Sequence, residues 1–432
     1  MEALQNFLMK WLMPIASKIE KQKHLQAIKD GMIGATPFII VGSMCLLPSA
    51  FMNLAGAGPI YDALSLVNPF FSVIAKYTND FLALYAAYLI ARSLAKRYEI
   101  NSTLLPISAV AVQFILTGVS IAGTSADGVE ISGLSTGYFG ASGLFVSIIG
   151  AIFTVEVARL LIKHNIVIKL PDSVPDMVSE SFSALIPIFV ACAGAGIVST
   201  LSTTLGGKVF PELINGLLAP AISSMDSLPA LLIVILLTQM LWFFGLHGPS
   251  ITQVAWAPFA IAYATENITN YAAGEAATHV FTYGFYYNIM QVTGSGITLG
   301  LVVFMLLSKS ATYKAIGKAA IVPSIFGINE PVIFGAPILL NPFMFIPFVF
   351  GPLVATVISW FAFTGGLVGM PIANPPGFMP PGIGAYLMTL DWRSVVLVAV
   401  LIVLMAIIYY PFFKLMEKEQ LQTEAANEAS EA

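Results

Sequence analysis

The chain has 432 residues, of which 57% are hydrophobic and only 10% are charged, whereas an average soluble domain has about 25% charged residues. So few charged side chains cannot cover the water-facing surface of so long a chain, which excludes a soluble globular enzyme and predicts a protein embedded in lipid. The formal net charge of −4 provides no basic surface, so we expect no nucleic-acid partner.

Residues 1–30 combine lysines with apolar side chains at helical spacing. Five lysines from Lys10 to Lys29 alternate with leucine, isoleucine, phenylalanine and tryptophan. This pattern is typical of an amphipathic helix that lies in the lipid headgroup region, although a plain cytosolic segment is an alternative. The continuous apolar stretch of a cleaved export signal is missing, so we expect no such signal.

Nine apolar segments are long enough to cross about 30 Å of hydrocarbon, for which a helix needs about 20 residues. They are residues 31–51, 72–91, 104–122, 139–162, 181–204, 228–246, 281–307, 343–366 and 393–413. Residues 249–264 and 319–341 are also apolar but contain prolines, so we expect re-entrant or broken helices there. The predicted fold class is an all-α polytopic membrane protein with about ten transmembrane helices, re-entrant hairpins and amphipathic interfacial helices.

The 19 lysine and arginine residues gather in a few loops, which the positive-inside rule places in the cytoplasm together with both termini. The apolar runs and the polar segments between them suggest five regions. They are the amphipathic lead-in 1–30, an N-terminal transmembrane domain 31–204, an interfacial linker 205–227, a C-terminal transport domain 228–416 and a disordered acidic tail 417–432.

Glu330 stands alone as a charged residue in the apolar tract between Lys318 and Asp391. A lone carboxylate in such a tract is costly, which makes it a candidate for function. It lies in the motif GINEPVIFG, where Gly327 allows close backbone approach, Asn329 provides an amide, and the proline after the acid breaks the helix. The motif can present a carboxylate and an amide to a polyhydroxy ligand. The alternative is a structural glutamate at the end of a broken helix.

His247 lies in a second motif, WFFGLHGPS, which begins at Trp242. Histidine exchanges a proton near neutral pH, and the neighbouring Gly245, Gly248 and Pro249 indicate an unwound loop around it. We therefore predict a functional histidine rather than a packed core residue, and we include the adjacent Gly248 among the substrate-binding candidates. Trp242 is a candidate for stacking on a sugar or, alternatively, an anchor at the membrane interface.

Residues 370–384 contain five prolines and three glycines and cannot form a spanning helix, so we expect a buried loop or lid. Its Asn374 is a candidate for a hydrogen bond to the ligand, and its Phe378 for a stacking platform. Asn288 lies in an apolar segment rich in tyrosine. It is a further candidate for substrate binding, although a hydrogen bond between helices would explain it equally well.

No phosphate-binding loop, zinc-protease motif or array of zinc ligands occurs, so we expect neither a metal nor a cofactor. The two cysteines lie in apolar runs and match no disulfide framework. Nothing in the sequence therefore energises transport by ATP hydrolysis, and the energy must come from elsewhere.

With WFFGLHGPS before it and NPPGF after it, GINEPVIFG resembles the membrane-embedded IIC component of the bacterial phosphoenolpyruvate-dependent sugar phosphotransferase system, in its lactose/cellobiose/chitobiose branch. The resemblance covers essentially the whole chain. It implies a homodimer in the bacterial cytoplasmic membrane, with the dimer interface in the N-terminal domain. The C-terminal domain would carry one disaccharide across by an elevator-like motion.

The same resemblance implies that phosphorylated IIB, supplied by IIA, transfers its phosphoryl group to the C6 hydroxyl of the sugar. The chain alone would then be a transport subunit rather than an enzyme. Glu330 would bond the hydroxyl that is phosphorylated and His247 would bind beside it, with Asn329 and Trp242 lining the site. Phe378 stands where chitobiose-type relatives would have a larger aromatic residue, which favours β-glucosides such as cellobiose.

Two other functions are compatible with the residues themselves. In a proton- or sodium-coupled secondary transporter, Glu330 and His247 would form a proton relay. In an intramembrane enzyme, Ser250 near His247 would be the nucleophile, although this spacing matches no known signature.

Overall fold

The computed structural model describes residues 18, 21–46, 48–49, 51–52, 57–100, 102–124, 130–171, 173–336, 338–377 and 379–431. The chain divides into two compact units. Among the described residues, the N-terminal unit comprises residues 18–223 and Ala257–Glu266, and the C-terminal unit comprises Ser224–Trp256 and residues 267–431. Phe378 and most of the predicted amphipathic lead-in lie outside the described residues.

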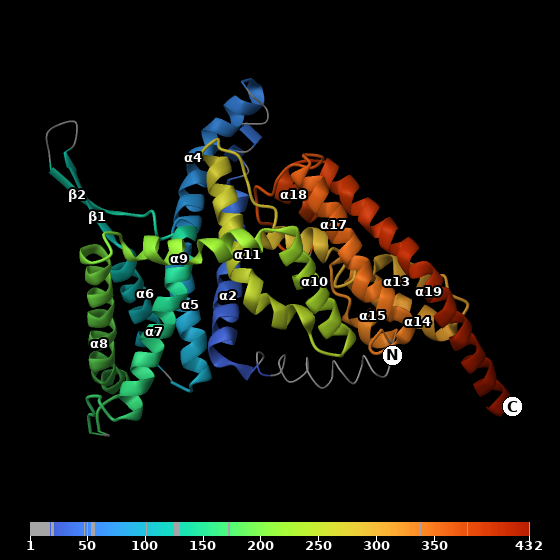
Figure 1. Cartoon of the computed structure of the whole chain (residues 1–432), viewed down its shortest axis with the longest axis horizontal. Coiled ribbons are helices and arrows are strands. Elements are labelled where there is room, and N and C mark those ends of the chain that lie inside the picture. The colour runs from blue at the N-terminus through green and yellow to red at the C-terminus, as the bar shows by residue number, and fades with distance from the viewer. Residues whose placement is uncertain are drawn as a thin grey trace. The chain divides into compact units, whose positions relative to one another are not determined.

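The N-terminal unit consists mainly of helices (Figure 1). They are α2 (Lys23–Cys45), α4 (Pro59–Asn79), α5 (Leu82–Arg97), α6 (Leu104–Thr117), α7 (Leu144–Lys163), α8 (Asp176–Thr204) and α9 (Phe210–Met225). The predicted all-α class omits one element, a hairpin of β1 (Val119–Thr124) and β2 (Glu130–Ser135) that follows α6. The predicted linker 205–227 is largely the helix α9.

Helix α5 forms the centre of the N-terminal unit and is rich in alanine, which allows its neighbours to approach closely. Its buried residues include Ala83, Ala87 and Ile90. A Cβ on Gly31 of α2 would lie only 2.6 Å from the backbone nitrogen of Ile90, so these two helices touch backbone to backbone. In contrast, only 17% of the most apolar stretch of α8 is buried. Most of that helix is therefore not covered by other parts of the chain.

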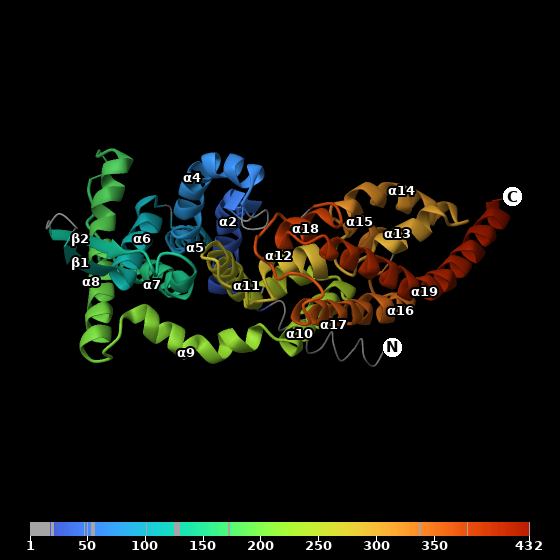
Figure 2. The same ribbon diagram turned by 90° about the horizontal axis from the view of Figure 1, so that it is seen from above.

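The C-terminal unit contains shorter and more broken elements. They are α10 (Leu228–Phe243), α12 (Tyr283–Phe285), the π-helical turn η2 (Tyr286–Met290), α13 (Leu299–Leu306), α14 (Ala311–Ile325), α15 (Glu330–Gly335), α16 (Pro342–Phe345), the π-helical turn η3 (Ile346–Phe350), α17 (Gly351–Thr364), α18 (Ile383–Thr389) and α19 (Arg393–Glu431). Figure 2 shows α13 and α14 side by side within this unit. Helix α11 (Gly248–Ala272) has residues in both units.

Two predictions about helix breaks are wrong. The predicted span 281–307 is interrupted between η2 and α13, because Gly294 and Gly296 adopt φ of 91° and 90° and turn the chain there. The predicted break in 249–264 is absent, and α11 is continuous. Its Pro249 lies in the first turn, where a missing N–H leaves no helical hydrogen bond unmade. The predicted break in 319–341 is confirmed between α14 and α15.

Several of the described helices are apolar and long enough to cross a membrane. Four meet this criterion by length and composition, and α9 with α10 would make a fifth if the two form one span. The four are Ala141–Lys163, Met177–Thr204, Pro342–Thr364 and Arg393–Ala426.

The predicted disordered tail is wrong from Glu417 to Glu431, because α19 continues through it. The segment is rich in alanine, glutamate and glutamine, which favour helices. Its carboxylates also bind the segment that starts α14: Glu417 accepts a hydrogen bond from the hydroxyl of Ser308 at 2.6 Å, and Glu424 accepts one from that of Ser310 at 2.6 Å. These contacts tie the end of α19 to the start of α14.

Candidate functional site

A tight turn between α10 and α11 brings His247 against Trp242. Gly245 adopts a φ of 83°, its N–H donates to the carbonyl of Trp242 at 2.9 Å, and the N–H of Leu246 donates to the carbonyl of Leu241 at 2.9 Å. These two bonds form a Schellman motif, which ends α10 sharply. The Trp242 and His247 ring centroids consequently lie 4.6 Å apart, with the planes inclined by 47°.

Gly248 is buried where the start of α11 packs on α10. A Cβ at this position would collide with the carbonyl oxygen of Thr238 and lie 2.9 Å from its carbonyl carbon. The hydroxyls of Thr238 and Thr252 hydrogen-bond at 2.8 Å and hold the two helices together just beyond this contact. Gly248 thus has a packing role that places the neighbouring histidine, and its predicted contact with substrate stays a prediction.

The ring of His247 caps the N-terminus of α11. Its Nδ1 accepts a hydrogen bond from the backbone N–H of Ser250 at 3.2 Å, and the Ser250 hydroxyl lies 2.7 Å from the same atom. A backbone N–H can only donate, so Nδ1 carries no proton in this geometry. The proton of a neutral ring is then on Nε2.

Glu330 faces that nitrogen from the start of α15. Its Oε1 lies 4.0 Å from Nε2 of His247, which is beyond hydrogen-bond distance, and their side chains are 44% and 50% exposed, respectively. The turn before α15 contains Gly327 with φ of 75°. One turn after Glu330, the ring of Phe334 lies 6.2 Å from that of Trp242. The structure therefore brings the predicted residues His247 and Glu330 together on one accessible surface, with the ring of Trp242, which is only 3% exposed, packed beneath His247.

Asn329 lies beneath this surface rather than on it. It is 3% exposed, and its Nδ2 donates to the carbonyl of Ser295 and to the hydroxyl of Thr298, the latter at 3.1 Å. Both amide hydrogens are therefore engaged within the chain. A Cβ on Gly294 would lie 2.6 Å from the Asn329 Oδ1, so a glycine is required for this approach. Asn329 holds the start of α15 against the turn before α13.

Asn288 and Asn374 form a second buried group around Gly284 of α12. Nδ2 of Asn288 donates to the Gly284 carbonyl at 3.1 Å, and a Cβ on Gly284 would lie 3.0 Å from Oδ1 of Asn374. A Cβ on Gly384 would lie 2.6 Å from Cγ of Asn288, so α18 also packs here. These two predicted residues are thus near each other. Their contact with a ligand stays a prediction, as does that of Phe378, which lies outside the described residues.

Gln253, one turn after Ser250 on α11, is a further residue of this region that the sequence motifs do not single out. Its Nε2 donates to the hydroxyls of Tyr283 and Tyr287 at 3.0 and 3.1 Å. A Cβ on Gly377 would lie 2.9 Å from Cβ of Tyr287, so the proline-rich loop packs on this group. The sequence feature that could have identified Gln253 is a polar amide in the apolar segment that directly follows the histidine motif.

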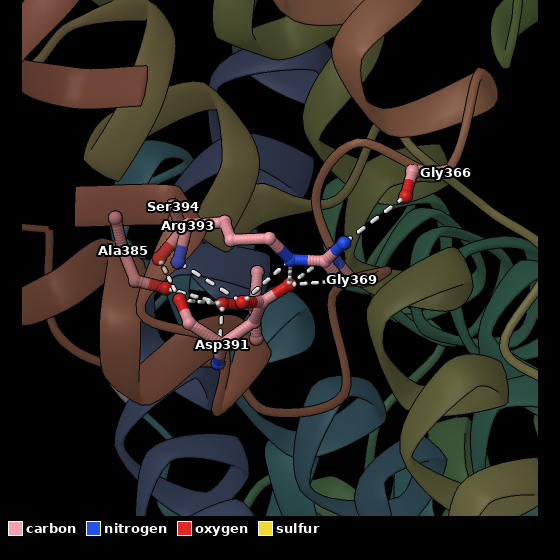
Figure 3. Close-up of polar contacts among 7 residues, drawn as sticks. Gly366, Gly369, Ala385, Asp391, Arg393 and Ser394 are labelled. Atoms are coloured by element: carbon pink, nitrogen blue, oxygen red, sulfur yellow. Dashed lines mark hydrogen bonds and ion pairs between the residues drawn. The ribbon is translucent and has the colours of Figure 1, made fainter. Parts of the chain in front are cut away.

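The proline-rich loop is held at its beginning. The N–H groups of Ile372 and Ala373 both donate to the carbonyl of Met388 at the end of α18, at 2.8 and 3.1 Å. Just before the loop, the N–H of Gly369 donates to Oδ2 of Asp391 at 2.8 Å, as Figure 3 shows. The loop that contains Asn374 is therefore anchored to α18 and to the start of α19.

Asp391 is itself held by Arg393, which donates from Nε to Oδ2 at 2.8 Å and from its backbone N–H to Oδ1 at 2.9 Å (Figure 3). Burial raises the pKa of this carboxyl, but the hydrogen bonds from Arg393 and Gly369 outweigh it and leave the pKa below its ordinary value. Nη1 of Arg393 also donates to the carbonyl of Gly366 at 3.4 Å. Asp391 is thus ionised at neutral pH and holds the turn after α17.

The facing side chains of His247 and Glu330 are suited to binding a hydroxyl group and exchanging its proton. No group of three or more His, Cys, Asp or Glu side chains that could hold a metal ion occurs in the part of the chain that the structure describes. A Ser250 nucleophile would need its base oriented by a third group. Glu330, at 4.0 Å from His247, does not make that hydrogen bond.

The family model described as "Phosphotransferase system, EIIC" matches residues 29–352, which include both the WFFGLHGPS and the GINEPVIFG motifs. The chain belongs to the EIIC family. This EIIC chain is therefore a IIC component of the phosphotransferase system, and IIC components are membrane transport subunits. The family resemblance seen in the two motifs is confirmed.

Individual relatives agree over nearly the whole length of this EIIC chain. It is 33% identical to the lichenan permease IIC component of Bacillus subtilis, covering 98% of this chain and 96% of the relative. It is 34% identical to the lactose-specific EIICB component of Streptococcus mutans, covering 96% and 73%, respectively. The crystal structure of ChbC, the IIC component of an N,N′-diacetylchitobiose-specific system, superposes with a TM-score of 0.88 at 31% identity over 97% of this chain and 99% of ChbC.

Proposed function

We propose that this EIIC chain binds a β-linked disaccharide of the cellobiose, diacetylchitobiose or lactose type. It would carry the sugar across the bacterial cytoplasmic membrane and present its C6 hydroxyl to a phosphorylated IIB partner. The relatives named for lichenan, lactose and N,N′-diacetylchitobiose support this substrate class. The observation that carries the proposal is the half-exposed pair of His247 Nε2 and Glu330 Oε1, 4.0 Å apart.

A sugar hydroxyl fits between these two atoms. An oxygen placed about 2.8 Å from each can accept the proton of Nε2 and donate its own proton to Oε1. Glu330 then takes the hydroxyl proton while the oxygen bonds to phosphorus, and the bond between phosphorus and the IIB cysteine sulfur breaks to leave a thiolate. The residues at the site supply positioning and proton transfer, and the partner supplies the phosphoryl group.

The same carboxylate favours release of the product. Phosphorylation adds roughly 1.5 to 2 negative charges at neutral pH. Once Glu330 has returned its proton to solvent, it repels the phosphosugar across a few ångströms of a partly desolvated site. Binding of the neutral sugar and release of the anionic product would therefore follow from one reaction on the cytoplasmic side.

We also propose the assembly and the motion. The protein would be a homodimer with about ten transmembrane helices in each chain and both termini in the cytoplasm. Residues 31–204 would form the dimer interface, and residues 228–416 would move in elevator fashion. The division into two compact units and the largely uncovered apolar surface of α8 support this arrangement. IIA would phosphorylate IIB upstream.

The experiment measures sugar uptake and phosphorylation in vesicles supplied with phosphorylated IIB. Glu330→Gln and His247→Ala should both lose activity, by about 100-fold or more if each takes part in proton transfer. His247→Asn is the matched control for folding, because asparagine is a good N-cap but has no group equivalent to Nε2. It should keep the thermal stability of the wild type and still lose activity. Full activity of Glu330→Gln and His247→Ala would refute the proposal.

A proton- or sodium-coupled sugar transporter is the second candidate, because the facing His247 and Glu330 could also pass a proton. The two functions differ in their energy source. Uptake that collapses with an uncoupler and continues without phosphoenolpyruvate would favour the secondary transporter. Uptake that requires phosphoenolpyruvate and the soluble phosphotransfer proteins would favour the IIC function.

A further inference from the structure

We propose that Ser250 is a positioning residue that fixes His247 in the tautomer with its proton on Nε2, an inference that rests on the proposed function of the His247 and Glu330 pair. Ser250 lies in the first turn of α11, three residues after the histidine. It approaches Nδ1 with two donors, its backbone N–H at 3.2 Å and its hydroxyl at 2.7 Å. The hydroxyl is the closer of the two.

The tautomer decides what the ring can offer to a ligand. With the proton on Nε2, the ring presents a donor toward Glu330, and a sugar hydroxyl between them can accept from His247 while it donates to the carboxylate. In the other tautomer Nε2 is an acceptor that faces another acceptor. A single hydroxyl proton could then satisfy only one of the two groups. The reacting oxygen would then receive no hydrogen bond from His247. Its own proton could go to Nε2 instead of to the Glu330 carboxylate.

The hydroxyl contributes beyond helix capping. Histidine is not among the residues preferred at an N-cap, and the long backbone contact alone would hold its ring loosely. Two donors that converge on Nδ1 define both the protonation of the ring and its plane. On one face, the ring of Trp242 at 4.6 Å limits rotation further. Ser250 therefore acts on the sugar only through His247.

The test compares Ser250→Ala with Ser250→Thr in the full-length protein, in vesicles with phosphorylated IIB and cellobiose. Alanine removes the hydroxyl but keeps the backbone N–H, so we expect the maximal rate of sugar phosphorylation to fall about tenfold, which is part of the usual contribution of general acid–base catalysis. The KM for the sugar should change by less than about threefold. Threonine restores the hydroxyl and should restore the rate to within about twofold.

A spectroscopic measurement separates this role from a merely structural one. The chain has four histidines, so the protein with ¹⁵N-labelled histidine has a tractable spectrum, and His247→Asn identifies the His247 signals. The wild type and Ser250→Thr should show one tautomer with the proton on Nε2. Ser250→Ala should show exchange between two tautomers at unchanged thermal stability.

Several results would overturn the inference. They are an unchanged rate in Ser250→Ala, an equal loss in Ser250→Thr, or the same single tautomer in all three proteins. Glu330→Gln, measured in parallel, keeps this failure distinct from that of the proposed function. If Glu330→Gln is inactive and Ser250→Ala is fully active, only the role of Ser250 is wrong. If Glu330→Gln is fully active, the proposed function itself is wrong.

Discussion

The carbonyl group of Thr238 lies against the Cα of Gly248, so that α10 and the first turn of α11 touch backbone to backbone. The contact sits immediately beside the residue that faces Glu330. Any displacement of this turn moves His247 relative to the carboxylate, because the ring is attached at the residue before Gly248. The packing of two helices thus determines the geometry of the pair that we propose binds the sugar.

Gly248→Ala should therefore disrupt both stability and activity. The added Cβ meets backbone atoms, which cannot rotate away as a side chain can, so we expect a loss of about 1–3 kcal/mol in the free energy of unfolding. Sugar phosphorylation should fall more than thermal stability alone explains. Gly216→Ala in α9 is the matched control, because a Cβ there meets nothing within 4 Å and should lower neither measurement. A Gly248→Ala protein equal to the wild type would contradict the packing role.

Asn329→Ala should lower stability through two unpaired acceptors. The carbonyl of Ser295 and the hydroxyl of Thr298 would lose their donor inside a buried turn, at a cost of about 1–3 kcal/mol. Sugar affinity, measured by titration calorimetry, should weaken because the start of α15 and with it Glu330 become less ordered. If Asn329 instead contacts the sugar and has no structural part, Asn329→Ala would weaken affinity at unchanged thermal stability.

The two candidate residues with the strongest sequence signal, Glu330 and His247, were predictable because each is a rare ionisable group beside helix-breaking residues in an apolar tract. Asn329 could also be identified from its motif. Its buried position beneath His247 and Glu330 could not be predicted from the sequence. Its partners lie in the turn before α13, and one of them is a backbone carbonyl, which no sequence pattern marks.

The positions of the helices could be predicted from the lengths of the apolar segments, whereas the breaks in these helices could be predicted only in part. Pro249 and Pro258 together predict a break at 249–264, but α11 is continuous there. Pro249 occupies the first turn, where proline is tolerated, and Pro258 lies within the helix without ending it. The chain breaks instead at Gly294 and Gly296, whose positive φ values depend on tertiary packing against Asn329 and Phe348. The extension of α19 escaped prediction for the same reason, since its stabilising contacts are with Ser308 and Ser310.

Glu417→Ala should loosen the start of α14. The substitution leaves the hydroxyl of Ser308 and the N–H of Lys309 without the carboxylate that now accepts from them at 2.6 and 3.0 Å. We expect faster amide hydrogen exchange at the start of α14 and a lower thermal stability of the full-length protein. Glu419→Ala, at an exposed position two residues later, should change neither measurement. Equal exchange rates in the two variants would refute the role of Glu417.

Asp391→Asn should remove an acid-dependent part of the stability. The pKa of the Asp391 carboxyl lies below its ordinary value in the folded protein, so the hydrogen bonds from Arg393 and Gly369 stabilise the fold fully at pH values above that ordinary value, about 3.9. This contribution is lost as the pH falls through the folded-state pKa.

We therefore expect Asp391→Asn to unfold at a lower temperature than the wild type at pH 7 and the difference to shrink as the pH falls below about 4. Thermal unfolding in detergent across this range measures both proteins. Glu275→Gln, at an exposed loop position, should follow the wild type throughout. A difference between Asp391→Asn and the wild type that stays constant down to the lowest pH would mean that the ionised carboxylate is not what holds the turn after α17 to the start of α19.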